Sequence, residues 1–278
     1  MPRFPLTKDG DPPPRHASLH QEAPRLTAVA ARKSGGISIP CTACPLRKLS
    51  RFREFNAEEL AFVLELKRGE LSVERGAAIV MEKSASPHLY TVLSGWGFRY
   101  KTLADGRRQI LNYILPGDFV GLQTSVFEMM DHGIESLTEM LLCVFPRDRL
   151  LDVYRRCPSL GFDITWLAAR QERLLDDNLL SVGRRTARER MAFIFLYFYR
   201  RAEEAGIVQG RKLRLPITQQ QLADTLGLSL VHTNRTLGKL RATGSIRWTD
   251  GTMEIVDVDR LIAIAGSDFA TDQVRPFI

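Results

Sequence analysis

One short stretch carries side chains that could read the edges of DNA bases. Val231, Asn234 and Arg235 stand at positions i, i+3 and i+4 of a predicted helix, so they would share one exposed face. Arg235 could donate both arms of its guanidinium to guanine O6 and N7, and Asn234 could pair with adenine. Val231 has no donor or acceptor, so it could only contact a thymine methyl or fill space. This spacing predicts a face that enters a major groove.

The residues just before this face have the spacing of a helix-turn-helix. Residues 217–229 read ITQQQLADTLGLS. Thr218 would cap a first helix, and Ala223 is small where two helices must cross closely. Gly227 permits the positive φ that ends this helix, and Ser229 would then cap the second helix. We expect the apolar residues of both helices to face the domain: Leu222, Leu226, Thr233, Leu237 and Leu240.

Four polar residues near this face are candidates for phosphate contacts, which position a protein on DNA without reading its sequence: Thr218, Gln219, Ser229 and His232. Lys239 and Arg241 add positive charge. The net charge of +7 suits a polyanion partner, although plain solubility also explains it. Arg235 could equally be an ordinary surface arginine, and Asn234 could merely satisfy a local backbone group.

The cysteines are the second set of residues that could do chemistry. Residues 1–40 lack the apolar segment of a signal peptide, and four cysteines are too few for a disulfide scaffold. Cys41 and Cys44 form a Cys-x-x-Cys pair, which could support a redox disulfide or zinc. The other reading is that Cys143 and the rest are inert core thiols.

An enzyme finds little support in the sequence. None of the five histidines belongs to a recognisable metal motif. There is no nucleophile elbow and no glycine loop that would bind phosphate. No apolar run is long enough to span a bilayer, so we expect a soluble protein.

The elements that must position these residues follow one another along the chain. Residues 1–40 are predicted to be a disordered tail. Asn56 can cap a helix that reaches about Leu66. Between Gly69 and Pro146, short β-favouring runs alternate with turn signals, which indicates an antiparallel sandwich or barrel. Asp105-Gly106 is its clearest hairpin.

A long helix is predicted to open at Pro158. Leu160, Ile164, Leu167 and Leu174 have the spacing of a coiled-coil seam, and Gln171 and Asn178 fall on the same seam. The alternative is an amphipathic helix that packs only on its own domain.

Three further segments complete the predicted order of elements. A core helix is predicted from Thr186 to Ala205, followed by the helix-turn-helix. A wing hairpin is then expected with its turn at Asp250-Gly251. The residues from about Gly266 look like a loose end.

This order resembles the Crp/Fnr family of bacterial regulators over roughly residues 41–265. The most specific parts are Pro116-Gly117-Asp118-Phe119-Val120-Gly121 and the helix-turn-helix. The resemblance implies an α+β chain with a cyclic-nucleotide-binding-like β-barrel (jelly roll) over 41–150, a dimerisation helix over 151–185, a winged helix-turn-helix over 186–266 and a tail over 267–278. It also implies a cytoplasmic homodimer that binds double-stranded DNA and RNA polymerase, and it favours the dimer seam.

The resemblance also bears on cofactors. Members that bind cyclic AMP carry a Glu directly after the Gly121 position and an Arg-Ser pair about ten residues later. Here the positions hold Leu122 and residues 132–135, and no arginine lies between Arg108 and Arg147. A buried phosphate without its cation would be costly, so the sequence argues against a cyclic nucleotide.

The oxygen-sensing branch instead holds a [4Fe–4S] cluster on four cysteines. Cys41, Cys44 and Cys143 match three of these positions, and Ser50 occupies the fourth. Cys157 is a spare thiol outside the pattern. The resemblance thus leaves an iron–sulfur cluster open, together with other thiol or metal chemistry and with inert cysteines.

The recognition helix departs from both well-known branches, which carry a Glu at the position of Val231. We therefore expect a different half-site at the base pair that the Glu would read. The sequence predicts a DNA-binding regulator that responds to oxygen, redox state or a related signal. A sensor that acts through a protein partner, with a degenerate DNA-binding domain, is the rival. The retained Arg235, Gly227 and Ser229 argue against it.

Overall fold

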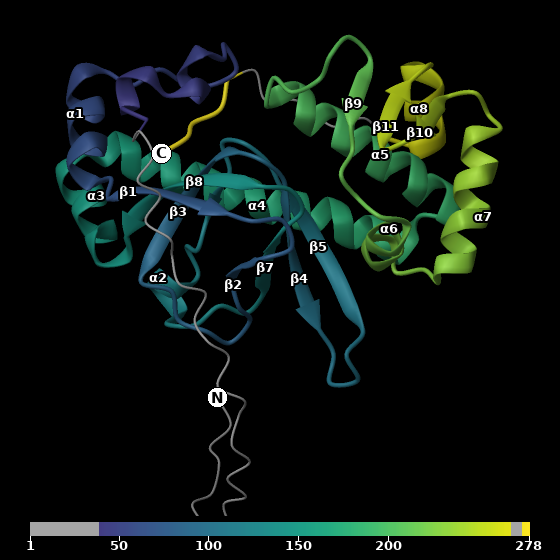
Figure 1. The fold of residues 1–278 in the computed structure, drawn as a ribbon, viewed down its shortest axis with the longest axis horizontal. Coiled ribbons are helices and arrows are strands. Elements are labelled where there is room, and N and C mark those ends of the chain that lie inside the picture. The colour runs from purple at the N-terminus through teal and green to yellow at the C-terminus, as the bar shows by residue number, and fades with distance from the viewer. Residues whose placement is uncertain (1–38, 268–273) are drawn as a thin grey trace, which may run out of the picture. The chain divides into compact units, whose positions relative to one another are not determined.

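The structure is a computed structural model that describes residues 39–267 and 274–278 (Figure 1). Its first elements are two short 3-10 helices and one α-helix: η1 (Cys41–Ala43), η2 (Pro45–Lys48) and α1 (Ala57–Leu66). Asn56 caps α1 as predicted, because its side chain accepts from the backbone N–H of Glu59 while Glu59 accepts from that of Asn56. The predicted tail over residues 1–40 lies outside the described residues except for its last two positions.

The β-domain consists of two four-stranded antiparallel sheets with the strand orders β1-β8-β3-β6 and β2-β7-β4-β5. Their inner faces bury one core, which includes Val92, Ile134 and Leu142. Five of the strands were predicted. The short or polar strands β1, β6 and β7 carry too weak an alternation to be recognised. The strands are β1 (Gly69–Val73), β2 (Ala78–Val80), β3 (His88–Ser94), β4 (Gly97–Thr102), β5 (Arg108–Ile114), β6 (Phe119–Val120), β7 (Gly133–Ser136) and β8 (Met140–Pro146).

The predicted hairpin joins β4 to β5. Gly106 has φ +85° at the turn, and the backbone N–H of Arg107 donates to Asp105 Oδ1 at 3.0 Å. The second half of the β-domain carries α2 (Thr124–Phe127), η3 (Arg147–Arg149) and α3 (Leu150–Arg156).

The long helix α4 (Pro158–Arg184) begins at the predicted proline. The residues predicted to form a dimer seam, however, do not lie on its exposed face. Leu160, Ile164, Leu167 and Leu174 are all buried inside the chain, where they pack on the β-domain side and on the following helix. A dimer seam and a packed amphipathic helix share the same apolar spacing, so the sequence could not separate them. The exposed apolar residues of α4 are instead Phe162, Leu175, Leu179, Leu180 and Val182.

The remaining elements form the second folded region. Thr186 caps the core helix α5, whose buried residues include Met191, Phe195 and Phe198. The predicted wing hairpin is confirmed, with positive φ at Asp250 and Gly251. Strand β9, which pairs with β11, was not predicted. The elements are α5 (Ala187–Glu204), β9 (Lys212–Arg214), α6 (Gln219–Leu226), α7 (Leu230–Arg241), β10 (Ile246–Thr249), β11 (Thr252–Ile255) and α8 (Val258–Ala265).

The expectation of a loose end after Gly266 is wrong for residues 274–278. Arg275, Phe277 and Ile278 are each less than 5% exposed, and Arg275 pairs with Phe52 in a parallel β-bridge. The sequence could not indicate this, because the contacts join residues more than two hundred positions apart. No α-helix in the described ranges is both long and apolar enough to cross a membrane.

Candidate nucleic-acid interface and sensor sites

The helix-turn-helix forms through the caps that the sequence predicted. Thr218 caps α6 in a reciprocal pair with Gln221. Gly227 ends α6 with φ +63°, in the left-handed conformation. Ser229 then caps α7, since its side chain accepts from the backbone N–H of His232 at 3.2 Å. The two helices therefore start and end where the motif requires.

Helix α7 separates into the two predicted faces. The inner face is buried through Thr233, Leu237 and Leu240. On the outer face Val231 is 79% exposed, and Asn234 and Arg235 are exposed beside it. Neither Asn234 nor Arg235 has a hydrogen-bond or ion-pair partner in the part of the chain that the structure describes, so their donors are available to a ligand.

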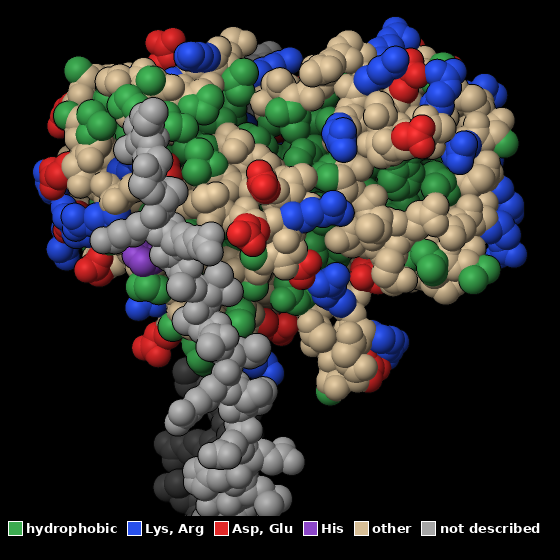
Figure 2. Space-filling view, viewed as in Figure 1, with side chains coloured by type: hydrophobic (Ala, Val, Ile, Leu, Met, Phe, Trp, Pro, Cys, Tyr) green, Lys and Arg blue, Asp and Glu red, His purple; other side chains and the backbone are tan. Residues whose placement is uncertain are grey.

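The residues around this face form a basic, polar surface. Figure 2 shows Lys and Arg side chains along the edge of the molecule where Figure 1 places α7. Exposed candidates for phosphate contacts are Thr218, Gln219, Ser229 and Lys239, whereas His232 is half-buried. The predicted site residues are thus brought onto one region of the surface around α7 and the start of α6.

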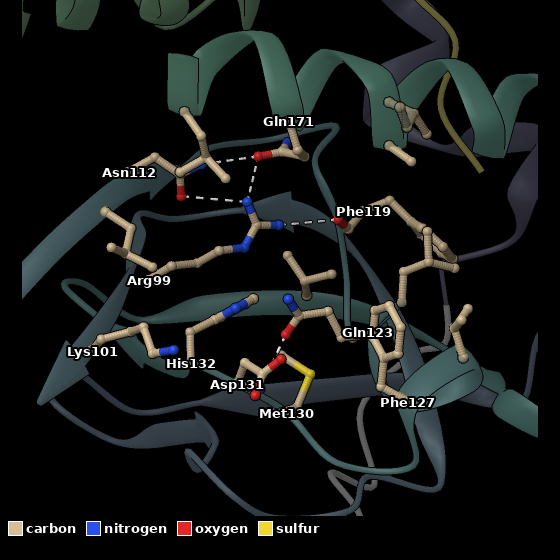
Figure 3. Close-up of a pocket in the computed structure, with 18 residues that line it drawn as sticks. Arg99, Lys101, Asn112, Phe119, Gln123, Phe127, Met130, Asp131, His132 and Gln171 are labelled. Carbon is tan, nitrogen blue, oxygen red and sulfur yellow. Dashed lines mark hydrogen bonds between the residues drawn. The ribbon is translucent and has the colours of Figure 1, made fainter. Parts of the chain in front are cut away.

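A second site is a cavity of about 510 Å³ between the β-domain and α4 (Figure 3). Arg99, on β4, is buried in its wall. Its Nη1 donates to Asn112 Oδ1 at 3.3 Å and to Gln171 Oε1, and its Nη2 donates to the carbonyl of Phe119 at 3.3 Å. All of these partners are neutral, so no carboxylate of residues 39–267 or 274–278 is hydrogen-bonded to the guanidinium.

Three further ionisable residues line the cavity, and of these only Lys101 is positively charged. Lys101 and His132 lie near Arg99 in Figure 3, and Asp131 is the single acidic residue of the lining. Burial, with Arg99 and Lys101 nearby, lowers the pKa of His132 to about 3, so its imidazole is neutral at pH 7. The rest of the wall is mostly apolar, including Leu122, Phe127 and Met130. A small anion with an apolar part suits this lining.

The polar residues predicted for a dimer seam are turned towards the β-domain instead. Gln171 Oε1 accepts from Asn112 Nδ2 at 3.0 Å as well as from Arg99, and Asn178 Nδ2 donates to the carbonyl of Leu111 at 2.7 Å. These hydrogen bonds are made inside the chain and not across the predicted seam. They tie α4 to the wall of the cavity.

Sequence reasoning missed Arg99 and Lys101. In members of the family that bind cyclic AMP the cation follows the Gly121 position, whereas here β4 carries both residues earlier in the chain. An available signal was the arginine between the aromatic residues Phe98 and Tyr100, since a charge next to residues that favour the core usually has a purpose.

The third site contains three of the four cysteines. Cys41, Cys44 and Cys143 line one cavity of about 20 Å³ together with Phe277 and Ile278. Burial raises the pKa of Cys143 to about 12, although nearby Lys67 opposes the shift, and burial also raises the pKa of Cys41.

The other two candidate ligands are elsewhere. Ser50 is exposed, and Cys157 lies at the start of α4 with its Sγ 3.7 Å from Ser159 Oγ. Neither lines the cysteine cavity.

These residues do not fit a [4Fe–4S] cluster. Four cysteine thiolates are the usual ligands of such a cluster, and the cavity offers three thiols. A volume of about 20 Å³ holds little more than one water molecule. Among the described residues, no group of three His, Cys, Asp or Glu side chains is arranged to hold a metal ion.

Comparison with known proteins agrees with this architecture. A family model described as a Crp-like helix-turn-helix domain matches residues 189–264, and one described as a cyclic nucleotide-binding domain matches residues 70–157. Among solved structures, that of FixK2 from Bradyrhizobium japonicum has a TM-score of 0.65 at 26% identity, over 73% of this chain and 98% of that one.

Several regulators of known function are similar over most of their length. The nitrogen fixation regulation protein FixK of Bradyrhizobium diazoefficiens is 30% identical, over 82% of this chain and 94% of that protein. The transcriptional activatory protein AadR of Rhodopseudomonas palustris is 30% identical, over 68% and 78%. The fumarate and nitrate reduction regulatory protein of Salmonella typhimurium is 24% identical, over 87% and 97%. With its two-sheet β-domain, long helix and winged helix-turn-helix, the chain belongs to the Crp/Fnr family of DNA-binding transcription regulators.

Proposed function

We propose that this regulator reads DNA through the exposed face of α7, with Arg235 as its main base contact. The observation that carries the proposal is the pair of exposed side chains, Asn234 and Arg235, whose donors have no partner in the described ranges. Arg235 would bond guanine O6 and N7, and Asn234 would contact adenine. Residues at the helix starts and on the outer surface would bind phosphates: Thr218, Gln219, Ser229, His232 and Lys239.

Selection from a random DNA library tests this proposal. We expect two inverted half-sites about one helical turn apart, each with a guanine whose replacement weakens binding. Because Val231 cannot accept a hydrogen bond, the half-site should differ at one base pair from the site that relatives with Glu there select. Recovery of that same half-site would contradict the role given to Val231.

The inverted repeat requires a homodimer, and we place its contact on the exposed face of α4. Leu175, Leu179 and Val182 stand at i, i+4 and i+7 on that face, and all three are exposed. A stripe of exposed apolar residues at helical spacing favours burial against a second helix. Acting on a promoter as a dimer in the cytoplasm, the protein would contact RNA polymerase, as the family relationship suggests.

For the signal, the geometry favours a small anion in the large cavity. Its entry would place negative charge beside Arg99, whose hydrogen-bonded partners are all neutral. Gln171 on α4 accepts a hydrogen bond from Arg99, so an anion that binds Arg99 would compete with Gln171. Anion binding would therefore change the contact between the β-domain and α4. A signal tied to oxygen or anaerobic metabolism remains part of the proposal, since similar proteins include one named as an anaerobic regulatory protein.

A thermal-shift screen with carboxylates and phosphate esters that carry an apolar group tests the anion site. At a concentration of about 100 Kd, a ligand should stabilise the protein by about 2.7 kcal/mol. Arg99→Met should lose this shift, while Arg107→Met, in the exposed hairpin, should keep it. Cyclic AMP is expected to give no shift. An equal shift in Arg99→Met and wild type would contradict the assignment.

An iron–sulfur cluster is not part of this proposal, because the donor set and the cavity do not fit it. Anaerobic purification with absorbance near 400 nm and iron and sulfide assays tests this directly. Iron and sulfide at cluster stoichiometry, lost in Cys143→Ser, would contradict the fit made from the structure.

A further inference from the structure

Residues 274–278 form a peptide that returns to the sensor half of the chain; we call it the C-terminal latch. Figure 1 shows this yellow segment ending near β8 and α1. The backbone N–H of Arg275 donates to the carbonyl of Arg51 at 2.9 Å, and that of Arg53 donates to the carbonyl of Arg275 at 2.8 Å. The latch therefore joins the sensor half through two backbone hydrogen bonds, without belonging to a sheet.

The side chain of Arg275 is held in a buried cluster of charges. It lies 3.5 Å from Asp118 Oδ1 and 3.6 Å from Glu204 Oε2, and it donates to the carbonyl of Pro116 at 3.1 Å. Arg170 and Arg201 also pair with these two carboxylates. Arg275 Nε is buried without a hydrogen-bond partner among the described residues.

The Arg275 Nε that has no partner among the described residues limits how firmly the latch is held. Removing a cation from water is costly, and its ion pairs offset that loss only when every donor is satisfied. Among the described residues, two backbone hydrogen bonds join the latch to the sensor half, so it can withdraw without unfolding a helix or a strand.

The apolar end of the latch covers the cysteine cavity. Phe277 stacks on Phe55 with ring centroids 4.8 Å apart and meets the ring of Phe52 edge-on at 5.3 Å. The hydroxyl of Thr91 donates to the carbonyl of Ile278. Phe277 and Ile278 thus form a wall of the cavity that belongs to no helix or strand, next to Phe55 from the loop before α1.

The cavity is so small that the latch controls access to the three thiols. At about 20 Å³ it admits at most about one water molecule, which is far smaller than an electrophile that carries a C=C bond. Cys41, Cys44 and Cys143 are each less than 9% exposed while the latch is seated. A group can join these thiols only if part of the lining moves, and the latch is a part of the lining that can leave without unfolding a helix or a strand.

We propose that Cys41, Cys44 and Cys143 form a modification site for small soft electrophiles, and that the C-terminal latch gates it. Latch closure and modification of these thiols are mutually exclusive. In the modification itself, the sulfur adds across the electrophile's C=C bond, and the thiol proton passes to the neighbouring carbon. Because residues 266–273 connect the latch to α8, modification would also release the end of the DNA-binding region from the sensor half; this last consequence rests on the proposed function.

Labelling of the full chain with N-ethylmaleimide, read for each cysteine by mass spectrometry, tests the gate. Phe277→Ala should raise the labelling rates of the three cavity thiols by about tenfold or more, because it removes most of the cover. Val274→Ala is the matched control, since Val274 belongs to the same segment but is 54% exposed. Cys157 is buried outside the cavity and serves as an internal control.

Two results would overturn the proposal. One is labelling of the cavity thiols at the same rate in Phe277→Ala and wild type. The other is a parallel rise for Cys157, which would mean that the reagent enters through opening of the whole region. A second measurement tests the effect of modification on the latch. Wild-type protein modified at the cavity thiols should lose the hydrogen-exchange protection of the Arg275 amide. Retained protection would show that the latch stays closed over modified thiols and would also refute the gate.

Discussion

The hydroxyl oxygens of Tyr113 and Thr225 lie 2.7 Å apart and join strand β5 to helix α6. Both side chains are buried, and burial raises the pKa of Tyr113 above its usual value, so its hydroxyl stays protonated. Nearby, Gln109 Nε2 donates to the carbonyl of Thr225 at 3.0 Å. The β-domain thus contacts the first helix of the helix-turn-helix directly, which gives a change in the sensor half a short route to α7.

Tyr113→Phe should remove the hydrogen bond between Tyr113 and Thr225, while the phenylalanine ring still fills the buried space. A buried hydrogen bond contributes about 1 kcal/mol net. The loss in the free energy of unfolding should stay near that value, because Thr225 Oγ1 keeps its hydrogen bond to the carbonyl of Gln221 at 2.7 Å. We expect a Tm lower by about 2–4 °C. Tyr154→Phe removes an exposed hydroxyl contact and is the control. An equal Tm in both variants would show that the Tyr113 contact carries no stability.

Asp118→Asn should be among the most damaging single substitutions. Its carboxylate accepts from Arg201 Nη2 at 2.6 and 2.8 Å and also faces Arg170 and Arg275. Removal of one partner from a buried ion-pair cluster costs about 3–5 kcal/mol. Denaturant unfolding measures this loss. Asp105→Asn, in an exposed pair, should change stability by less than about 1 kcal/mol. Similar effects of the two substitutions would contradict the role of the cluster.

The same carboxyl group should give the protein an acid-sensitive stability. Although burial opposes ionisation, the three arginines lower the pKa of Asp118 from 3.8 to about 2. A lowered folded pKa means that the stabilisation is complete above about pH 4 and is lost as the pH falls towards 2. The free energy of unfolding, measured against pH, should therefore fall in this window more steeply for wild type than for Asp118→Asn. Parallel curves would contradict the assigned pKa.

Leu179→Glu should break the proposed dimer. Leu179 is 73% exposed on α4, and a carboxylate in the centre of an apolar interface would be buried without a partner. Sedimentation velocity should show a dimer for wild type and a monomer for the variant. Leu103→Glu is the control, because Leu103 is 59% exposed but lies in the β4–β5 hairpin. A dimeric Leu179→Glu protein would place the dimer contact elsewhere.

The sequence was most informative where structure depends on neighbours in the chain. The caps at Thr218 and Ser229 and the turn at Gly227 depend on local backbone geometry, and all three were predicted. The face of α4 was predicted wrongly at Leu160, because helical periodicity shows that one face is buried but not against what.

Contacts between distant residues left no such local signal. Arg99 meets Gln171 across 72 positions, and Thr91 meets Ile278 across 187. Only the folded chain shows that Arg99 belongs to the large cavity and that Ile278 covers the thiols.

The most direct test of the central claim compares two DNA duplexes in equilibrium titrations at one salt concentration. One duplex carries the selected half-sites and the other a scrambled sequence. Arg235→Ala should weaken binding to the first by about tenfold to a hundredfold, since a bidentate base contact contributes about 1–3 kcal/mol, and should scarcely change binding to the second. Lys239→Ala, a predicted phosphate contact, should weaken both alike. If Arg235→Ala binds both duplexes as wild type does, α7 does not read DNA, and a sensor that acts through a protein partner becomes the better account.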